Sequence, residues 1–509
     1  MLQQKTERDY PVDVDEEFKF ELSTPVVRQG PDGRPLVPQP SSDPADPLNW
    51  SWSWKHIILL QVAIGRFGEI GKQFHVPVNV VSYQVSGHVI GVGIGNLFWT
   101  PLSNSYGRRP CYIAAALITL IANIGGSFTT SYAGLMVSRV FQGFGSGAPN
   151  TMAAVTIADI FFLHERGAKT GVWIYCTTAG PYLGPIITGF LIQAKDWQWA
   201  LYLTTIIKAF LFVFMLFFLP ETLYARQNSE ETQTSSNASD WPKTEQSLHP
   251  IRYNLLRNPF KRIGPPATFN EFLRPFKMLR YPSVTLIALP ISFGISYSDV
   301  GLTSLIPQVF KPLYGFNSQQ QGLTFFGFLI GCLIGETLAG KLSDVIVSRR
   351  TKANKGIFEP EMRLTAFPLG VFFMATGLLL WGIFVDIPTP WIGPVFVGGE
   401  FNLRKETHRE RETDHNQGVT ICGVQMVTTM GMAYVIDCYS PGPGGSAGPT
   451  IIFFCRQVMS LIVPFYNVPV ANKIGFTKWF IIQFALIVGS SIGSLMLLWR
   501  GKHWRQLYG

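Results

Sequence analysis

The stretch GHVIGVGIGNLFWTPLSNSYGRR occupies residues 87–109, and the stretch GFLIGCLIGETLAGKLSDVIVSR occupies residues 327–349. They align without a gap at a constant offset of 240 residues, with eight identical positions. Each copy is a glycine-rich apolar segment that leads into a basic turn. Such a distant repeat in a hydrophobic chain predicts two homologous membrane halves, an arrangement that many transporters use to build a site at mid-membrane. The alternative, two unrelated spans with similar flanks, is disfavoured because the match extends to Ser103 and Arg109.

The composition is that of a membrane protein. The chain is 47% hydrophobic and only 14% charged, whereas a soluble domain carries about 25% charged residues. Ten apolar stretches are long enough to cross a hydrocarbon core of about 30 Å. These stretches are Val85–Leu102, Cys111–Phe128, Leu135–Phe162, Gly171–Ile192, Ala200–Leu219, Val284–Val309, Gly322–Leu342, Leu364–Val385, Pro449–Val470 and Trp479–Trp499.

The polar segments divide the chain and predict its orientation. The first 48 residues carry ten acidic residues and eight prolines, so we expect residues 1–54 to form a disordered cytoplasmic tail. The N-terminal bundle is predicted over 55–222, a cytoplasmic linker over 223–281 and the C-terminal bundle over 282–504. With both termini cytoplasmic, the short inner segments carry twelve basic residues and the outer loops five, as the positive-inside rule requires. In the linker, Phe272–Arg280 is predicted to lie as an amphipathic segment on an anionic leaflet.

Several other classes of protein are disfavoured. The six cysteines are scattered without the spacing of metal ligands or disulfides, so we expect no metal or cofactor. No nucleophile–base set or phosphate loop is recognisable, and an enzyme is not expected. The net charge of +9 does not indicate nucleic-acid binding, because the basic residues lie where membrane topology places them.

A series of short motifs occurs in order along the chain and resembles one family. The motifs are Asp46–Trp50 before span 1, Pro101–Arg109 after span 2, Arg139–Gly143 in span 4, Gly180–Pro185 in span 5, Pro220–Thr222 after span 6, Gly340–Asp344 in the second repeat and Phe358–Glu361 before span 9. Together they resemble fungal members of the major facilitator superfamily, close to the twelve-span drug:proton antiporters. The resemblance implies an all-α membrane protein with the major facilitator fold, two pseudo-symmetric six-helix bundles.

The basic turn of the repeat resembles the superfamily's conformational latch. Cations at the inner ends of helices can bond to helix carbonyls and to acids and so stabilise one conformation. The family's acid is replaced by Asn104, whereas the second copy keeps Asp344, so we expect a weaker latch in the N-terminal half. The alternative is that the arginines only fix topology. The candidate latch residues are Asn104, Gly107, Arg108, Arg109, Asp344 and Arg349.

The span 5 motif resembles the one that marks exporters in this family. Gly180, Pro181, Gly184 and Pro185 remove side chains and backbone donors within a helix, which permits kinking and close helix approach. The alternative is generic tight packing. Pro185 stands where the family has a glycine, which weakens the argument for export.

Ionisable residues within spans are costly and are therefore functional candidates. We predict Asp299, Glu336 and Arg139 as candidates for proton coupling, with a structural polar pair as the alternative for the two acids. Arg456 is expected to reach toward the inner surface, and Lys208 to face lipid or a partner.

Two regions depart from the family pattern. Span 1 is truncated, because His56–Ile64 gives only nine residues before the first charge at Arg66, about 13 Å of helix. Span 10 is interrupted by the charged block Glu400–Gln417. We hypothesise that this block is a translated intron; the alternative is a genuine extramembrane loop.

The sequence thus predicts a secondary transporter for proton-coupled export of a small organic molecule such as a drug, toxin or secondary metabolite. Uptake of a small organic cation or nutrient is the alternative transport activity. A sensor without transport, or an inactive product, is the alternative of another class. The expected partners are substrate, protons and the lipid bilayer, and a monomer in the plasma membrane is expected.

Deleting Glu400–Gln417 is expected to raise both protein yield and transport. A charged residue at a helix centre costs about 2.5–3.5 kcal/mol on insertion scales, so this block must loop out and leave Trp391–Gly399 too short to cross. Quantitative immunoblotting and flux assays of the two chains test this expectation. Equal yield and flux would show that the block is a tolerated loop.

Overall fold

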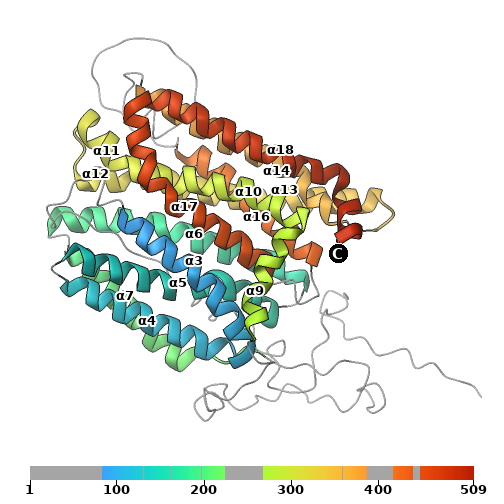
Figure 1. Cartoon of the computed structure of the whole chain (residues 1–509), viewed down its shortest axis with the longest axis horizontal. Coiled ribbons are helices and arrows are strands. Elements are labelled where there is room, and N and C mark those ends of the chain that lie inside the picture. Colours follow the sequence, from blue (N-terminus) through green and yellow to red (C-terminus); the bar gives the residue numbers. More distant parts are fainter. Residues whose placement is uncertain are drawn as a thin grey trace, which may run out of the picture.

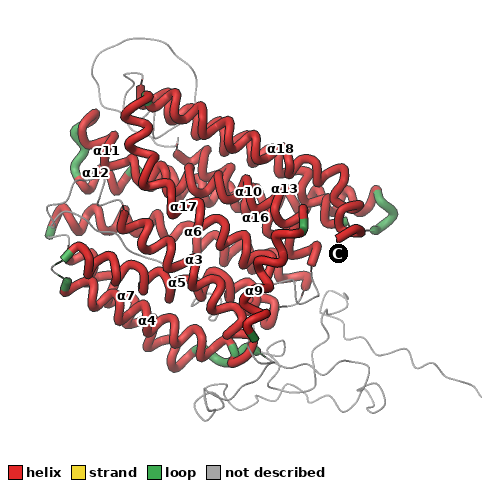
Figure 2. The backbone as a smooth tube through the Cα atoms, viewed as in Figure 1, coloured by secondary structure: helices red, strands yellow, loops and turns green. Residues whose placement is uncertain are grey.

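The computed structural model describes residue 55 and residues 83–129, 131–161, 163–195, 198–223, 268–357, 359–386, 417–439 and 447–508. Every regular element in these ranges is a helix, and short turns connect neighbouring helices (Figures 1 and 2). The predicted tail, the truncated span 1 and the charged block lie outside the described residues, except for Gln417, the last residue of the block, which begins a helix.

The N-terminal bundle contains five long described helices. They are α3 (Tyr83–Tyr106), α4 (Arg108–Phe128), α5 (Tyr132–Ile160), α6 (Leu163–Ala194) and α7 (Gln198–Phe218). Gly107 separates α3 from α4 and has φ 107°, a conformation that side chains beyond glycine rarely adopt. The turn between the first two described helices therefore depends on this glycine.

The C-terminal bundle begins after the short helix α9 (Phe269–Lys277) and the turn η2 (Met278–Arg280). Its elements are α10 (Pro282–Ile295), the π-helical segment η3 (Ser296–Gly301), α11 (Leu302–Tyr314), α12 (Ser318–Leu323), α13 (Phe325–Ala353), η4 (Pro360–Ala366), α14 (Phe367–Asp386), α16 (Gln417–Tyr439), α17 (Ala447–Ile474) and α18 (Phe476–Tyr508). Each of the ten stretches predicted to cross the membrane falls on helical segments. The interrupted span 10 still provides a helix, α16.

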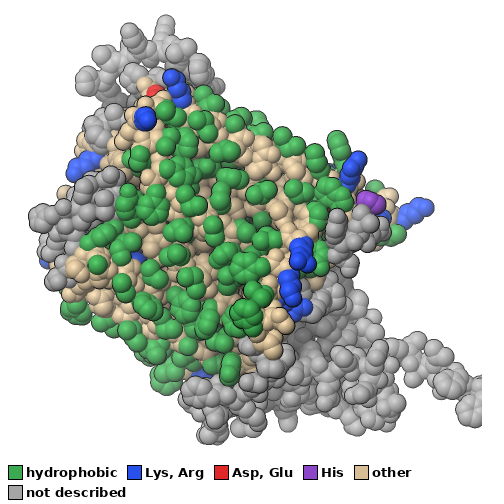
Figure 3. Space-filling model, viewed as in Figure 1, with side chains coloured by type: hydrophobic (Ala, Val, Ile, Leu, Met, Phe, Trp, Pro, Cys, Tyr) green, Lys and Arg blue, Asp and Glu red, His purple; other side chains and the backbone are tan. Residues whose placement is uncertain are grey.

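Eight helical segments in the described ranges are long and apolar enough to cross a membrane. The helices α3, α5 and α6 are also long, but they are less apolar than these eight segments because they carry many small and polar residues. Figure 3 shows a broad apolar surface with Lys and Arg side chains gathered toward its two ends. This distribution matches that of a multi-pass membrane protein, whose apolar belt faces lipid while charges lie at the two interfaces.

The sequence repeat corresponds to a repeated helix contact. A Cβ atom added to Gly91 would lie 2.1 Å from the carbonyl oxygen of Val140 on α5, and one added to Gly331 would lie 2.1 Å from that of Gly418 on α16. Gly95 and Gly335, one turn later, also meet the backbone of α5 and α16. Small residues permit this close approach in membranes, where lipid removes most of the hydrophobic drive for helix association. The two halves are therefore built around the same backbone contact.

The two bundles meet along two seams. In the first, α3 packs on α17: the Ser86 hydroxyl donates to the carbonyl of Leu461 at 3.0 Å, and the Thr100 and Thr450 hydroxyls lie 3.4 Å apart. In the second, α6 packs on α12 and α13, with the Tyr182 and Phe328 rings 5.2 Å apart.

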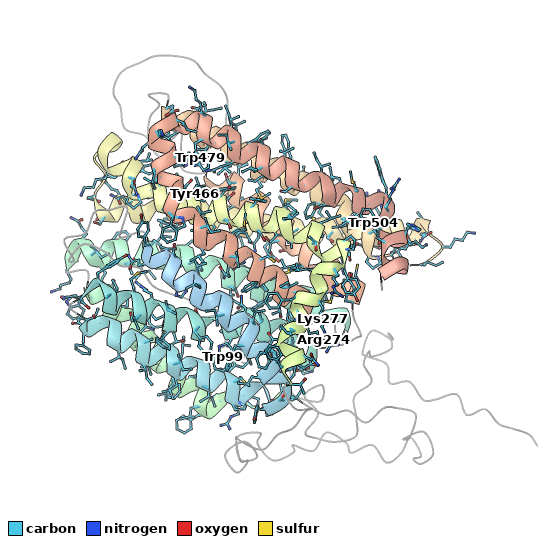
Figure 4. The ribbon with its side chains drawn as sticks, in the orientation of Figure 1. Trp99, Arg274, Lys277, Tyr466, Trp479 and Trp504 are labelled. Carbon is cyan, nitrogen blue, oxygen red and sulfur yellow. The ribbon has the colours of Figure 1, made fainter. Side chains whose placement is uncertain are left out.

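Helix α9 of the linker spans the first seam at one end of the bundles. Its Phe272 ring lies 6.1 Å from Phe98 of α3, and its Phe276 ring lies 5.4 Å from Phe454 of α17. Arg274 and Lys277 lie on the same short helix, near the end of the molecule that holds the C-terminus (Figures 1 and 4). This part of the predicted amphipathic segment therefore contacts both halves.

Replacing Gly331 by alanine is expected to lower stability by about 1–3 kcal/mol, because the added methyl group overlaps the backbone of Gly418. Gly91→Ala is expected to have the same effect at the equivalent contact. Thermal unfolding of the purified protein measures both changes.

Gly340→Ala is the matched control, since a Cβ atom at this position of α13 meets nothing within 4 Å. It should leave the unfolding temperature unchanged or slightly raised, because alanine favours a helix over glycine. Equal effects at Gly331 and Gly340 would contradict a packing role for the repeated glycine.

Candidate functional site

A cavity of about 240 Å³ lies between the two bundles. Helices α3, α5, α6 and α7 line it from the N-terminal half, and α10, η3, α11, α13 and α17 from the C-terminal half. Its described ionisable lining residues are His88, Arg139, Tyr182, Lys208, Asp299 and Arg456. Two of the three predicted coupling candidates, Arg139 and Asp299, are therefore brought to one cavity.

Asp299 is the only carboxylate among the described lining residues. It lies on η3, and π-helical turns within α-helices occur frequently at functional sites. Tyr182 of the opposite half and Arg456 both interact electrostatically with Asp299. One acid thus connects α6 of the N-terminal half with α17 of the C-terminal half.

A buried polar network holds the segment that carries Asp299. The Asn467 side chain on α17 is fully buried and donates to the carbonyl of Gly301 at 3.0 Å, at the end of η3. The Asn467 carbonyl oxygen accepts from Trp479 Nε1 at 2.7 Å, and the Tyr466 hydroxyl donates to that of Tyr297 at 3.1 Å. Figure 4 shows Tyr466 and Trp479 near one end of the helices. This buried network helps to fix the backbone of the segment that carries Asp299.

Arg139 lies on α5 and is 7% exposed. Its Nη1 donates to the Gln142 side-chain oxygen at 2.9 Å, one turn along the same helix. The guanidinium therefore belongs to the N-terminal wall of the cavity.

Glu336 lies apart from the residues that line this cavity. Its carboxylate accepts from Thr429 at 2.8 Å and from Gln425 at 3.0 Å, both on α16. Gln425 Nε2 also lies 3.3 Å from the Thr178 hydroxyl of α6. Glu336 thus belongs to a polar cluster in the second seam rather than to the cavity shared with Asp299.

The predicted N-terminal latch residues come together around Arg108, which is 4% exposed. Its guanidinium donates to Asn104 at 2.6 Å, to Ser103 at 2.8 Å and to Asp159 of α5 at 3.2 Å. The residue that contacts Asn104 is therefore Arg108, whereas Arg109 points to a different partner. Asp159 supplies the charge that Asn104 lacks.

Arg109 and Glu221 cap two neighbouring helices reciprocally. The Glu221 carboxylate accepts from the backbone N–H groups of Arg108 at 2.8 Å and Arg109 at 3.2 Å, at the first turn of α4. The Arg109 side chain donates to the carbonyls of Leu219 and Leu216 at the end of α7. Opposite charges at opposite helix ends are the favourable arrangement. Burial raises the pKa of the Glu221 carboxyl, and the backbone hydrogen bonds partly oppose this rise.

The C-terminal half forms its equivalent contact with a different arginine. Arg363 of η4 pairs with Asp437 at the end of α16 and lies 3.8 Å from Asp344. Asp344 and Asp437 thus surround Arg363 as Asn104 and Asp159 surround Arg108. Arg349, the repeat partner of Arg109, is exposed on α13.

The span 5 motif lies where α6 meets both the cavity and the second seam. Gly180 and Gly184 are buried, and Pro181 and Pro185 line the cavity. A Cβ atom added to Gly322 of α12 would lie 2.6 Å from the carbonyl oxygen of Pro185. Close helix approach at this motif is therefore observed.

Sequence reasoning missed several of these residues. Arg456 was expected to reach the inner surface, but it lines the cavity and its guanidinium lies over the Phe453 ring at 5.1 Å. Lys208 also lines the cavity. The charge of Arg456 and Lys208 within apolar spans could have indicated that they line the cavity. Asn467 carries no charge, and only its hydrogen bond to Gly301 shows that it supports η3.

Comparison with known proteins places the chain among membrane transporters. Residues 60–464 match the Major Facilitator Superfamily. An MFS transporter of Aspergillus oryzae, cpaT, is 30% identical over 70% of this chain and 72% of its own length. Fluconazole resistance protein 1 of Saccharomyces cerevisiae is 27% identical over 72% of this chain and 68% of its own length. The structure of the human organic anion transporter MFSD10 has a similar fold, with TM-score 0.50 and 17% identity over 87% of this chain and 89% of that one.

Asn104→Asp is expected to strengthen the contact with Arg108. A second carboxylate beside this arginine could shift the conformational equilibrium by about 1 kcal/mol, roughly fivefold in populations. We expect slower labelling of a cysteine placed at Thr450, which lies against Thr100 in the first seam.

The control is Asn104→Asp in an Arg108→Gln background, because the new carboxylate then has no arginine at position 108 to pair with. The slower labelling should disappear there. Unchanged labelling in the single variant would show that Asn104 does not affect the conformational equilibrium.

Proposed function

The chain belongs to the major facilitator superfamily, and we propose that it couples proton movement to the export of a small amphipathic organic molecule. The observation that carries this proposal is the cavity between the bundles, with Asp299 as its only described carboxylate. Members of this superfamily carry small molecules across membranes, and a site at the interface of two repeats suits alternating access.

The two seams support a rocking motion of the halves. The contacts across the seams include a hydroxyl pair at Thr100–Thr450, a ring contact at Tyr182–Phe328 and an amide–hydroxyl contact at Gln425–Thr178. The ion pairs Arg108–Asp159 and Arg363–Asp437 each join helices within one half. Opening a seam would therefore separate weak contacts between the halves rather than these ion pairs.

Asp299 is our proposed proton carrier. In a low-dielectric site a carboxylate is favoured in its neutral, protonated form, whereas a neighbouring cation such as Arg456 favours the ionised form. Movement of Tyr182 or Arg456 relative to Asp299 would change that balance when the halves rock. Arg139 is proposed to adjust the electrostatic potential in the cavity. Glu336 remains a second candidate for proton binding, in the second seam.

Export is proposed as the direction. The span 5 motif of α6 resembles that of exporters, and relatives include fluconazole resistance protein 1 and a cycloheximide resistance protein of Candida maltosa. Uptake is the alternative direction, and a sensor without flux is the alternative of another class. We place the protein in the plasma membrane as a monomer, with the latch residues facing the cytoplasm.

Asp299→Asn is expected to abolish pH-driven concentrative transport while leaving counterflow exchange intact. The amide cannot cycle a proton, but exchange of substrate across the membrane requires no net proton release. The measurement is efflux from yeast lacking its own exporters, with a compound panel that includes fluconazole and cycloheximide, followed by counterflow in proteoliposomes.

Glu271→Gln on α9 is the matched control, because this acid lies outside the cavity and pairs with Arg274 on its own helix. It should retain pH-driven flux. Unchanged concentrative transport by Asp299→Asn would remove Asp299 from the coupling mechanism.

A further inference from the structure

The helix α9 and the turn η2 present an exposed basic side. The one acid of these two elements, Glu271, pairs with Arg274 at 3.2 Å. Lys277 and Arg280 are exposed on the same segment. Residues three positions apart lie close together on a helical surface, and cations bind phosphate oxygens through charge-assisted hydrogen bonds. Lys277 and Arg280 can therefore bind one phosphate group together.

Large apolar side chains are exposed beside these cations. Phe269 is 75% exposed, and Leu273 and Leu279 are also exposed. Pro275 and Met278, in contrast, are buried. The segment thus has one side packed on the protein and another that carries both apolar and basic groups. This combination is typical of helices that lie in a membrane interface and bind anionic lipids.

The position of α9 agrees with such an interface. The segment Pro282–Lys311, which is long and apolar enough to cross a membrane, begins directly after η2 and Tyr281. Figure 4 shows Arg274 and Lys277 toward one end of the helices, far from Trp479 at the other end. We propose that α9 and η2 form a binding surface for anionic phospholipids, which offer hydrocarbon to the exposed apolar side chains and phosphate to the cations.

Bound lipid would also act on the conformation, because α9 bridges the two halves. Its Phe272 ring contacts Phe98 of α3, and its Phe276 ring contacts Phe454 of α17. Opening the first seam at this end separates Phe98 from Phe454, and one short helix cannot follow both. A lipid that binds α9 in its bridging position therefore favours the closed first seam, since a ligand shifts an equilibrium toward the state that it binds better.

The binding surface is tested by titrating the purified full-length chain with phosphatidylserine or phosphatidylcholine and counting bound lipids by native mass spectrometry. We expect phosphatidylserine to bind more tightly than phosphatidylcholine. The double variant Lys277→Gln/Arg280→Gln should lose affinity for phosphatidylserine by roughly fivefold for each cation removed.

The matched control is Lys473→Gln/Lys478→Gln, which removes two exposed lysines where α17 ends and α18 begins. It changes the net charge by the same amount and should bind phosphatidylserine as the wild type does. Gel-filtration profiles establish that both double variants are folded.

The effect on the seam is tested by labelling a cysteine placed at Thr450, which lies against Thr100 and one turn before Phe454. The chain without this added cysteine gives the background rate. Phosphatidylserine added to phosphatidylcholine liposomes should slow the labelling about threefold, the population shift that a threefold preference for the closed state produces. Lys277→Gln/Arg280→Gln should remove this slowing, because the lipid is no longer held.

Phe272→Ala/Phe276→Ala separates binding from the bridging role. It should still bind phosphatidylserine through its cations but should lose the slowing, because α9 no longer joins the halves. If this variant does not fold, the labelling of Lys277→Gln/Arg280→Gln decides the question, since that variant keeps the bridge and lacks the lipid.

Equal binding of the two lipids would overturn the proposal in favour of an acidic protein segment as the occupant. Unchanged phosphatidylserine affinity in Lys277→Gln/Arg280→Gln would also overturn the proposed surface. Labelling that phosphatidylserine leaves unchanged or accelerates would overturn the effect on the seam. None of these measurements uses a proton gradient or a transported compound, so their outcome is independent of the proposed function.

Discussion

Helices surrounded by lipid gain little from burying apolar surface against each other, so the close backbone contacts at Gly91 and Gly331 are the constraint on which each bundle depends. These glycines place α3 directly on α5 and α13 directly on α16. The outer sides of α3 and α13 are then free to form the seams with α17 and α6. The cavity lies between the two halves that these seams join.

The helix ends around Arg108 and Arg363 show that the two halves share an arrangement built from different residues. In the N-terminal half, Arg108 follows directly after the repeat turn and lies between Asn104 and Asp159. In the C-terminal half the central cation is Arg363, which comes from η4 and lies between Asp344 and Asp437. The conserved physical requirement is a guanidinium between a turn side chain and an acid at a helix end. Its position in the chain is not part of that requirement.

The described charges of the cavity lie on three helices and one π-helical segment, and three of them have a visible structural support. Asp299 stands on η3, which Asn467 holds through the carbonyl of Gly301. Arg139 is oriented by Gln142, and Arg456 lies over the Phe453 ring. Rigid placement of a few charges is what allows a membrane site to discriminate between ligands, because the surrounding low dielectric strengthens every unbalanced interaction.

The sequence by itself determined the class of fold, because spans of about 20 apolar residues and the 240-residue repeat are local patterns that lipid and helix geometry impose. It also identified Asp299 and Arg139 as costly intramembrane charges. Only the tertiary structure decided that these two share a cavity with Arg456 while Glu336 lies in a seam, and that Arg108 rather than Arg109 contacts Asn104. The physical reason is that spans reveal which residues enter the membrane, whereas the direction of each side chain depends on helix rotation. That rotation is set by contacts between segments far apart in the chain, such as Gly331 with Gly418 and Asn467 with Gly301.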